Sequence, residues 1–310
     1  MINTKERTNN TQSYACLNKN EKIRRKSSSG GLFTLLAEKI IDEGGIVFGA
    51  SFTDDFELVH SFVENKEELA KFRGSKYLQS KIGDSFKQVK EFLKEGRNVL
   101  FSGTPCQIAG LLAYLDKDYE NLICVDLICY GVPSFKVFKL YKEEMEKEYN
   151  SKVNKIAFRH KKYGWELFSL YLSFENGKEY IKDVTKDPYL KGFVENLYLR
   201  PSCYDCKFRT LNRLRDITIA DCWGIENIDP QLNDDKGLSL ALTNSNKGKK
   251  LFSLLKDKMV VKEIDLQKAI EYNSAATEPV PKNPKRDEFF SHINSSKKQI
   301  IELIDYFIED

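Results

Sequence analysis

The pattern of apolar and polar positions predicts an α/β fold in the first half of the chain. Four short apolar runs have the length of buried strands, and they lie at residues 13–18, 46–52, 98–103 and 121–131. Four longer runs have helical periodicity, and they lie at residues 32–43, 84–94, 104–115 and 134–148. Residues 57–63 are expected to pair with residues 46–52 as a hairpin. We therefore expect a mixed sheet core with flanking helices.

The pattern changes near residue 150. Residues 152–180 alternate apolar and polar side chains around a turn at Asn176 and Gly177, which is typical of an antiparallel hairpin. Further short strands are expected later in the chain, at residues 216–221, 237–243 and 259–264. We expect four portions: a flexible N-terminus at 1–13, an α/β portion at 14–150, an antiparallel β-rich subdomain carrying a cysteine loop at 151–245, and a helical portion at 246–310.

Composition narrows the class of protein. The chain has 310 residues, of which 41% are hydrophobic and 31% charged, as is typical of a globular protein with a sizeable core. Its formal net charge of +3 is too small to predict binding to nucleic acid or to an anionic membrane. No apolar run approaches the ~20 residues of a membrane span, and the polar opening lacks a signal peptide's apolar core. We expect a cytoplasmic protein without a membrane span, whose seven cysteines serve metal binding or redox chemistry rather than disulfides.

Cys203 and Cys206 form the most informative motif of the chain. Two residues separate them, and thiolates at this spacing can bind one metal ion or one iron–sulfur cluster. The pair supplies half of the usual four ligands, so the others must come from elsewhere in the chain. The remaining cysteines are Cys16, Cys106, Cys124, Cys129 and Cys222. Spacing alone allows both zinc and a four-iron cluster.

Cys106 and Cys129 are the best placed of the remaining cysteines. Cys106 lies in the first turn of a predicted helix, and Cys129 lies where a predicted strand ends. If the strands before them are parallel neighbours, both cysteines emerge at the same edge of the sheet. Cys124 lies deeper in its strand and is interpreted as a core residue. Cys222 is either a fifth candidate ligand or part of a turn packed on the core.

Other stretches have the composition of a cofactor site. The serines and glycines at residues 27–31 form either a phosphate-binding helix N-terminus or an ordinary helix cap. The loop at residues 73–80 could line a cofactor, with a solvated loop as the alternative. The basic run at residues 19–26 and the cationic, aromatic turn at residues 159–165 are each interpreted as solvated surface or as contacts to an anionic cofactor. His60 is expected to be a packed or surface residue rather than a ligand.

Several segments of the chain form a specific set. They are KSSSGGLFTLLAEKIIDEGGIVFGASF, KYLQSKIGDSF, FSGTPCQIAGL, VDLICYGVPS and RPSCYDCKFRTLNRLRDITIADCWG, over roughly residues 13–225. Together and in this order they resemble the coenzyme F420 hydrogenase/dehydrogenase beta-subunit family, which includes the chlorophyll-cycle reductase acting on hydroxymethyl chlorophyll. Several motifs in one order are far more specific than any one of them.

The resemblance implies an oxidoreductase with FAD and a 4Fe-4S cluster, which passes electrons between a one-electron iron–sulfur chain and a two-electron hydride carrier. The cluster ligands that it implies are Cys106, Cys129, Cys203 and Cys206. The flavin-site residues that it implies are Ser29, Gly30, Gly31, Lys76, Tyr77 and Gln79, with Thr104 as a further cofactor-binding candidate. The α/β portion at 14–150 would then be the flavin-binding portion.

The resemblance also suggests the partners. Many relatives begin with a ferredoxin-like module of two cysteine clusters, and the opening of this chain has no such run. Electrons are therefore expected to come from a separate ferredoxin-like or other redox protein, and the hydride acceptor or donor to be F420 or another small molecule. The alternative is a non-catalytic binding or assembly module stabilised by zinc. In a third interpretation Cys106 is a redox nucleophile, which leaves Cys203 and Cys206 without a role.

Overall fold

The computed structural model describes residues 11–212, 215–295 and 298–309. Contacts between residues divide the chain into two compact units, each assembled from three separate stretches. The first unit contains the residues up to Arg73, Ser80–Cys129 and Lys207–Glu278. The second contains Gly74–Gln79, Tyr130–Cys206 and the residues from Pro279 onward. The stretch at 151–245, expected to form one portion, is therefore shared between the two units.

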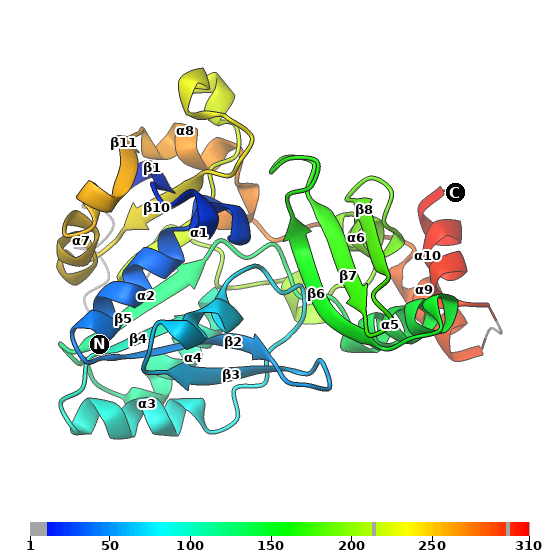
Figure 1. The fold of residues 1–310 in the computed structure, drawn as a ribbon, viewed down its shortest axis with the longest axis horizontal. Helices are drawn as coiled ribbons and strands as arrows, with labels where there is room; N and C mark the ends of the chain where they lie inside the picture. Colours follow the sequence, from blue (N-terminus) through cyan, green and yellow to red (C-terminus); the bar gives the residue numbers. More distant parts are fainter. Residues whose placement is uncertain (1–10, 213–214, 296–297, 310) are drawn as a thin grey trace. The chain divides into compact units, whose positions relative to one another are not determined.

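An eight-stranded mixed sheet organises the first unit (Figure 1). The order of its strands is β11-β1-β10-β9-β5-β4-β2-β3. Four adjacent strands are parallel, namely β2 (Ile46–Phe52), β4 (Val99–Gly103), β5 (Leu122–Leu127) and β9 (Ile217–Asp221). The other four are antiparallel to their neighbours, namely β1 (Gln12–Asn18), β3 (Leu58–Val63), β10 (Ser239–Thr243) and β11 (Met259–Glu263).

Alternating side chains of the parallel strands build a hydrophobic core on each face of this sheet. The helices of the unit are α1 (Glu21–Lys26), α2 (Leu32–Asp42), α3 (Ser85–Lys94), α4 (Pro105–Leu115), α7 (Asn246–Ser253) and α8 (Leu266–Glu271). Val47 and Leu100 pack with α2 and α7 on one face. Phe48 and Phe101 pack with α3 and α4 on the other face. The structure confirms the expected mixed sheet core with flanking helices.

The structure corrects three local predictions. The basic run before the Ser/Gly turn contains the short helix α1, and its Arg24 turns inward, is 3% exposed and forms an ion pair with Asp234. Strand β5 ends at Leu127, earlier than expected. The sequence pattern predicts the proline-rich residues 279–290 as a connection between two helices, but a further helix, α9 (Arg286–Ser295), begins within them.

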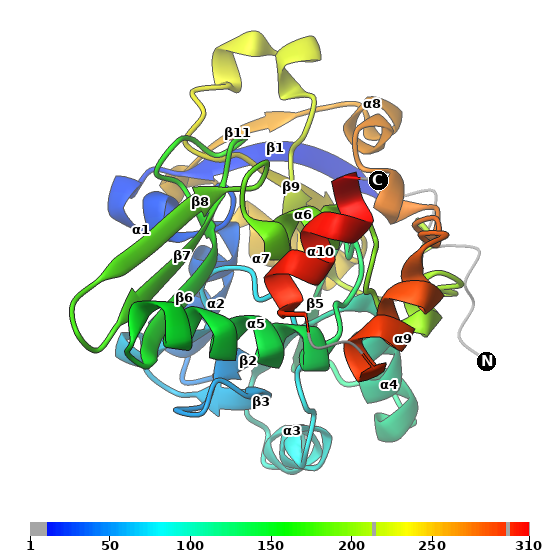
Figure 2. The same ribbon diagram turned by 90° about the vertical axis from the view of Figure 1, so that its right-hand side faces the viewer.

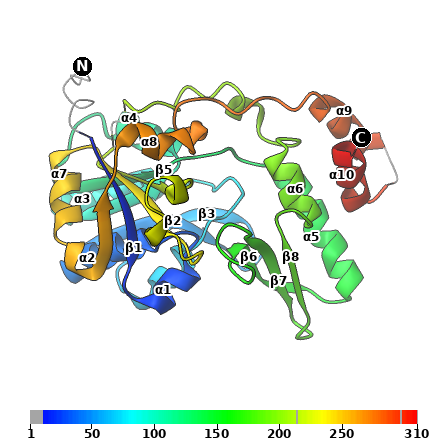
Figure 3. The ribbon, with the colours of Figure 1, turned by 90° about the horizontal axis from the view of Figure 1, so that it is seen from above.

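A three-stranded antiparallel sheet lies at the centre of the second unit, with strands β6 (Val153–His160), β7 (Ser169–Phe174) and β8 (Glu179–Asp183). The helices of this unit are α5 (Phe135–Tyr149), α6 (Pro188–Val194), α9 and α10 (Ile300–Glu309). Helices α5 and α6 lie between the sheet and the pair α9 and α10 (Figures 2 and 3). This arrangement confirms the antiparallel β-rich subdomain, and the same unit contains the loop with Cys203 and Cys206.

None of the helices in the described ranges is both long and apolar enough to cross a membrane.

Aromatic rings fill the space between the layers of the second unit. Phe158 of β6 contacts Tyr189 of α6, which contacts Tyr198, and Tyr198 contacts Phe289 of α9. The ring centroids in this series lie 6.0, 5.6 and 5.8 Å apart. Rings at this spacing contribute packing beyond the burial of their area, so they hold the three layers together.

Asp187 joins the sheet and two helices of the second unit through hydrogen bonds. It is fully buried and caps α6 by accepting the N–H of Leu190 at 2.7 Å. Its second carboxylate oxygen accepts the hydroxyls of Tyr141 in α5 and Tyr180 in β8, each at 2.8 Å. Burial raises the pKa of Asp187 to about 6. One carboxylate therefore satisfies three buried donors from three elements.

Replacing Asp187 by alanine is expected to lower the free energy of unfolding by about 3 kcal/mol, because it removes a helix cap and leaves two buried hydroxyls without their acceptor. Asp265→Ala is the matched control, since exposed Asp265 caps α8 through the N–H of Lys268 at 3.0 Å. The control should lose about 1 kcal/mol. Urea titrations of both variants measure the difference, and equal losses would show that the tyrosine contacts add no stability.

Candidate functional site

The pairing of β4 with β5 places two of the expected cluster ligands at one edge of the large sheet. These parallel strands are neighbours, and their last register pair joins Gly103 to Asp126. Cys106 and Cys129 each lie three residues further along the chain than their member of this pair. Both cysteines therefore follow the carboxyl ends of adjacent parallel strands, where functional groups gather in α/β folds.

Cys106 is held outside the core at the start of α4. It is the exposed member of the seven cysteines, and Pro105 before it occupies the first position of the helix. Its Sγ lies 3.2 Å from Oγ1 of Thr104. Oε1 of Gln107 accepts the N–H of Thr104 at 2.9 Å, which closes the turn. The sequence motif thus presents a thiol beside a helix N-terminus and next to a hydroxyl.

A buried ion pair lies at the same end of β5. Asp126 has no exposed surface, Arg215 is 5% exposed, and Nε of Arg215 donates to the carboxylate of Asp126. Arg215 precedes β9, so the pair joins two neighbouring strands of the sheet. Removing Asp126 would leave the buried charge of Arg215 without this carboxylate, which is strongly destabilising.

The structure separates the seven cysteines into two classes. Cys16, Cys124 and Cys222 are buried, and burial raises the pKa of each thiol, to about 12 for Cys222. The four expected cluster ligands are exposed or partly exposed. The core interpretation of Cys124 is confirmed, and Cys222 is also packed in the interior.

The loop with Cys203 and Cys206 is fastened by the tyrosine between them. The hydroxyl of Tyr204 donates to the carbonyl of Asn196 at 2.6 Å and accepts the N–H of Leu199 at 3.1 Å. Both thiols are partly exposed. This pair belongs to the second unit, whereas the other two expected ligands belong to the first. In the described ranges, no three His, Cys, Asp or Glu side chains are grouped so that they could hold a metal ion.

The turn before α2 packs tightly against the large sheet. Gly30 leaves no room for a side chain, because a Cβ there would lie 2.4 Å from the carbonyl oxygen of Cys16. Its N–H donates to Oγ of Ser239 at 2.9 Å, and the hydroxyl of Ser29 donates to the carbonyl just before β10 at 2.5 Å. Gly31 has a φ of 86°, which glycine adopts without strain. Sheet packing therefore fixes the position at which α2 begins.

The N-terminus of α2 has the electrostatic character of an anion site. No side chain of the described residues caps it, and its first turn contains no acidic residue. Arg73, the first residue of the candidate loop at 73–80, donates from Nε to Oγ1 of Thr34 in this turn at 3.0 Å. Burial lowers the pKa of Arg73. A guanidinium beside the positive end of a helix favours an anionic ligand.

Lys76 and Gln79 lie in the short stretch Gly74–Gln79 of the second unit. Desolvation lowers the pKa of Lys76 to about 7, and its amine donates to the carbonyl of Gly74 at 3.1 Å. The side chain of Gln79 is exposed. A lysine that titrates near neutral pH can bind an anion in its charged form or exchange a proton with a ligand.

Tyr77 is fixed between an aromatic ring and an arginine of the second unit. Its ring stacks on Phe193 with the centroids 4.5 Å apart. Its hydroxyl accepts Nη1 of Arg159 at 3.3 Å, and the same guanidinium lies 4.0 Å from the ring centroid of Phe168. Arg159 belongs to the cationic, aromatic turn at residues 159–165. Trp165 of the same turn is a core residue that is 1% exposed. That turn therefore contributes to both the core and the surroundings of Tyr77.

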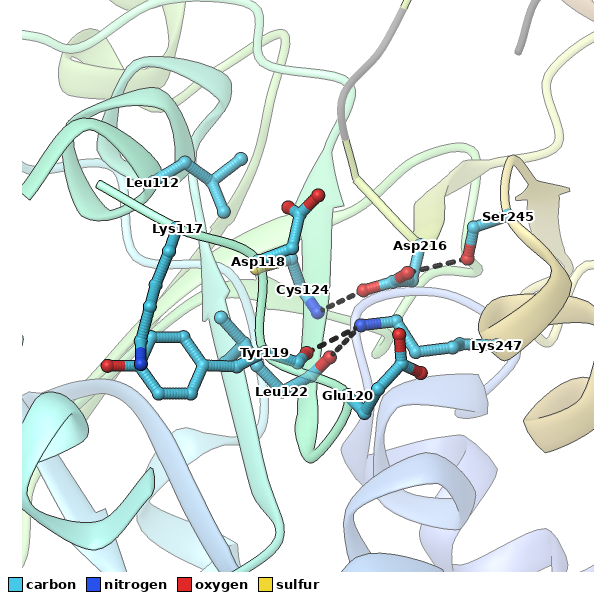
Figure 4. A pocket seen from close by; sticks show the side chains of 10 residues that line it. All are labelled: Leu112, Lys117, Asp118, Tyr119, Glu120, Leu122, Cys124, Asp216, Ser245 and Lys247. Carbon is cyan, nitrogen blue, oxygen red and sulfur yellow. Dashed lines mark hydrogen bonds between the residues drawn. The ribbon is translucent and has the colours of Figure 1, made fainter. Parts of the chain in front are cut away.

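A cavity of about 90 Å³ lies at the other end of the parallel strands, where β5 and β9 begin (Figure 4). Asp216 accepts the N–H of Cys124 at 2.8 Å and the hydroxyl of Ser245 at 2.5 Å. Lys247 donates to the carbonyl of Tyr119 at 2.8 Å and to a second carbonyl at the start of β5. These two charged groups join β5 to β9 and α7, and none of the expected site residues lines the cavity.

Comparisons with known proteins agree with the resemblance seen in the sequence. Two family models match, both described as coenzyme F420 hydrogenase/dehydrogenase, beta subunit: the model of its N-terminal part matches residues 13–87, and the model of its C-terminal part matches residues 96–269. A chain of the F420-reducing NiFe hydrogenase complex from Methanosarcina barkeri has a similar fold, with a TM-score of 0.56 and 18% identity over 85% of this chain and 89% of that chain. No curated protein matches the sequence. The chain belongs to the coenzyme F420 hydrogenase/dehydrogenase beta-subunit family.

Proposed function

We propose that this chain is an oxidoreductase subunit that contains FAD and a 4Fe-4S cluster. The FAD would supply hydride exchange with a small molecule, which is coenzyme F420 or another acceptor or donor. The cluster, held by Cys106, Cys129, Cys203 and Cys206, would supply single-electron exchange with a ferredoxin-like or other redox protein. Membership of a family described as F420 hydrogenase and dehydrogenase beta subunits supports a role in redox electron transfer.

The exposure of the thiols is the observation that carries this proposal. The four proposed ligands are the four cysteines that the fold leaves accessible, and the other three are buried with raised pKa values. A thiol must lose its proton to bind iron, and burial in the interior opposes that loss. Four accessible thiols therefore fit the ligand set of a 4Fe-4S cluster.

Chain connectivity adds support for two of these ligands. Pro133 forms an antiparallel bridge with Leu199 inside the second unit. Cys129 precedes Pro133 by four residues and Cys203 follows Leu199 by four, so the chain allows each cysteine at most about 14 Å from the bridge. In an antiparallel bridge, the segment before Pro133 and the segment after Leu199 extend in the same direction. This favours one shared metal centre for the thiols of Cys129 and Cys203.

The start of α2 and the loop after Arg73 fit an anionic dinucleotide. Backbone N–H groups of α2 are proposed to bind a phosphate of FAD with Arg73 beside them. Lys76 follows Arg73 by three residues, so their Cα atoms lie within about 11 Å of each other. The residues proposed to complete the flavin site are Ser29, Gly30, Gly31, Tyr77, Gln79 and Thr104.

When bound, FAD supplies a carrier that takes up two electrons as a hydride and exchanges them singly with a cluster. The chain's own residues bind and orient it. Ser29, Gly30 and Gly31 fix the start of α2 by packing on the sheet, and the stacked ring of Tyr77 gives a rigid surface. Lys76 is proposed to hold a proton where the cofactor carries negative charge, because its pKa lies near neutral.

Protein purified without oxygen is expected to contain FAD and about four iron and four sulfide per chain. Cys206→Ser should lose most of its iron, because a thiolate ligand is removed. Cys222→Ser is the matched control, since Cys222 is a buried cysteine outside the proposed ligand set, and its iron content should equal that of the unaltered protein. Metal analysis and visible absorption measure these contents.

Two outcomes would contradict this proposal in different ways. Unchanged iron in Cys206→Ser would refute the choice of ligands. One zinc per chain in a colourless protein would refute the cluster and support the zinc-stabilised binding or assembly module instead.

The dissociation constant of FAD for flavin-free protein should rise between pH 7 and pH 9. Below pH 7 the amine of Lys76 is already protonated, so its contribution is constant. Above pH 7 the protein must take up a proton to bind the anion, and affinity falls by at most about tenfold per pH unit. Titration of flavin fluorescence at several pH values measures this slope.

Lys76→Gln should remove this dependence on pH. Lys81→Gln is the matched control and should keep it, because the Lys81 side chain is 65% exposed and pairs with Glu57 on the surface. The same slope in Lys76→Gln as in the unaltered protein would show that another group binds the anion.

A further inference from the structure

A buried histidine starts a series of hydrogen bonds in the first unit. His60 of β3 is 7% exposed, and its ring stacks on Phe101 of β4 with centroids 5.1 Å apart and planes 10° apart. Its Nε2 lies 3.0 Å from the carbonyl oxygen of Ser102, and its Nδ1 lies 2.8 Å from Oγ of Ser80. The ring thus reaches from β3 to β4 across β2, which lies between them in the sheet.

The series continues from Ser80 to the turn that carries Cys106. Nε2 of Gln107 donates to Oγ of Ser80 at 2.8 Å, and Oε1 of Gln107 accepts the N–H of Thr104 at 2.9 Å. Gly103 leaves room for this bend, because a Cβ there would lie 3.1 Å from Oε1 of Gln107, a tight contact. Gln107 therefore folds back over the end of β4, one residue after the exposed cysteine.

Every donor in this series meets one acceptor. A carbonyl oxygen can only accept, so Nε2 of His60 carries a proton and Nδ1 accepts the hydroxyl of Ser80. The oxygen of Ser80 is then free to accept from the amide of Gln107, whose own oxygen faces Thr104. One tautomer of the ring and one orientation of the amide satisfy all four bonds.

We propose that His60, Ser80 and Gln107 are positioning residues, which hold the Thr104–Cys106 turn so that the sulfur of Cys106 points in one direction. Buried polar groups are costly unless satisfied, and apolar side chains would fill the same space, so this series is better explained by orientation than by packing. The inference rests on the proposed role of Cys106 as a cluster ligand. Ser80 directly follows Gln79, so the series also ties the proposed flavin loop to this turn.

Ser80→Ala and Gln107→Leu each interrupt the series, and Ser51→Ala is the matched control. Ser51 is 4% exposed, and its hydroxyl bonds to Ser61 at 2.9 Å in the pairing of β2 with β3. Iron release from the oxygen-free holoprotein to a ferrous chelator should be roughly tenfold faster in the two interrupted variants, as for other residues that support metal ligands. The electron paramagnetic resonance spectrum of the reduced cluster should change in these variants and stay unchanged in the control.

The urea midpoints of Ser80→Ala and Ser51→Ala distinguish an effect on the orientation of Cys106 from an effect on the stability of the fold. Similar midpoints with a changed spectrum only in Ser80→Ala support the inference. An unchanged spectrum and unchanged iron release in both interrupted variants overturn it.

The failure of the proposed function is distinguishable from the failure of this inference. If the unaltered protein holds no cluster, the proposed function fails, and the isolated protein still tests the positioning of the turn. Faster hydrogen exchange at the N–H of Thr104 and an altered alkylation rate of Cys106 in Gln107→Leu, but not in Ser51→Ala, then support the inference. Equal rates in both variants overturn it.

Discussion

The parallel pairing of β4 with β5 is the constraint that determines where Cys106 and Cys129 lie, at the carboxyl ends of two neighbouring strands. It aligns Gly103 with Asp126, and the turns that follow carry Cys106 and Cys129. Phe101 faces one core of this sheet and Leu100 the other, so a slip of one residue would exchange their environments. Hydrophobic packing on both faces therefore fixes the register, and the register fixes where the two thiols emerge.

Buried polar groups make the second kind of constraint, and they join segments that are distant in the sequence. Asp187 connects two helices and a strand, the ion pair of Arg24 with Asp234 spans 210 positions, and the hydrogen bonds of His60 reach the start of α4. Each of these groups is matched by a partner, as the low dielectric of the interior demands. Polar contacts of this kind specify one arrangement where apolar packing alone would tolerate several.

Local periodicity was sufficient to predict the parallel strands, the helices after them and the hairpin of β2 and β3, because each has its own apolar face. It failed for α1, because Arg24 looks like a surface residue until Asp234 is known to face it. The sequence separated the accessible cysteines from the buried ones only in part: Cys124 was predicted to be buried, because it lies within the apolar pattern of a strand. The series from His60 to Gln107 could not be predicted, because each member has an ordinary local context and three of its four bonds join residues 20 to 42 positions apart.

Each compact unit is assembled from three separate stretches, and the chain passes between the units beside several of the candidate ligands. Cys129 is the last residue of a stretch of the first unit, and Cys206 is the last residue of a stretch of the second. The loop with Lys76 is a complete stretch of the second unit, and the chain belongs to the first unit before and after it. No single cut divides such a chain into its two units. A gene fusion or truncation cannot transfer one of them without the other, so the segments proposed for flavin and for iron are inherited together.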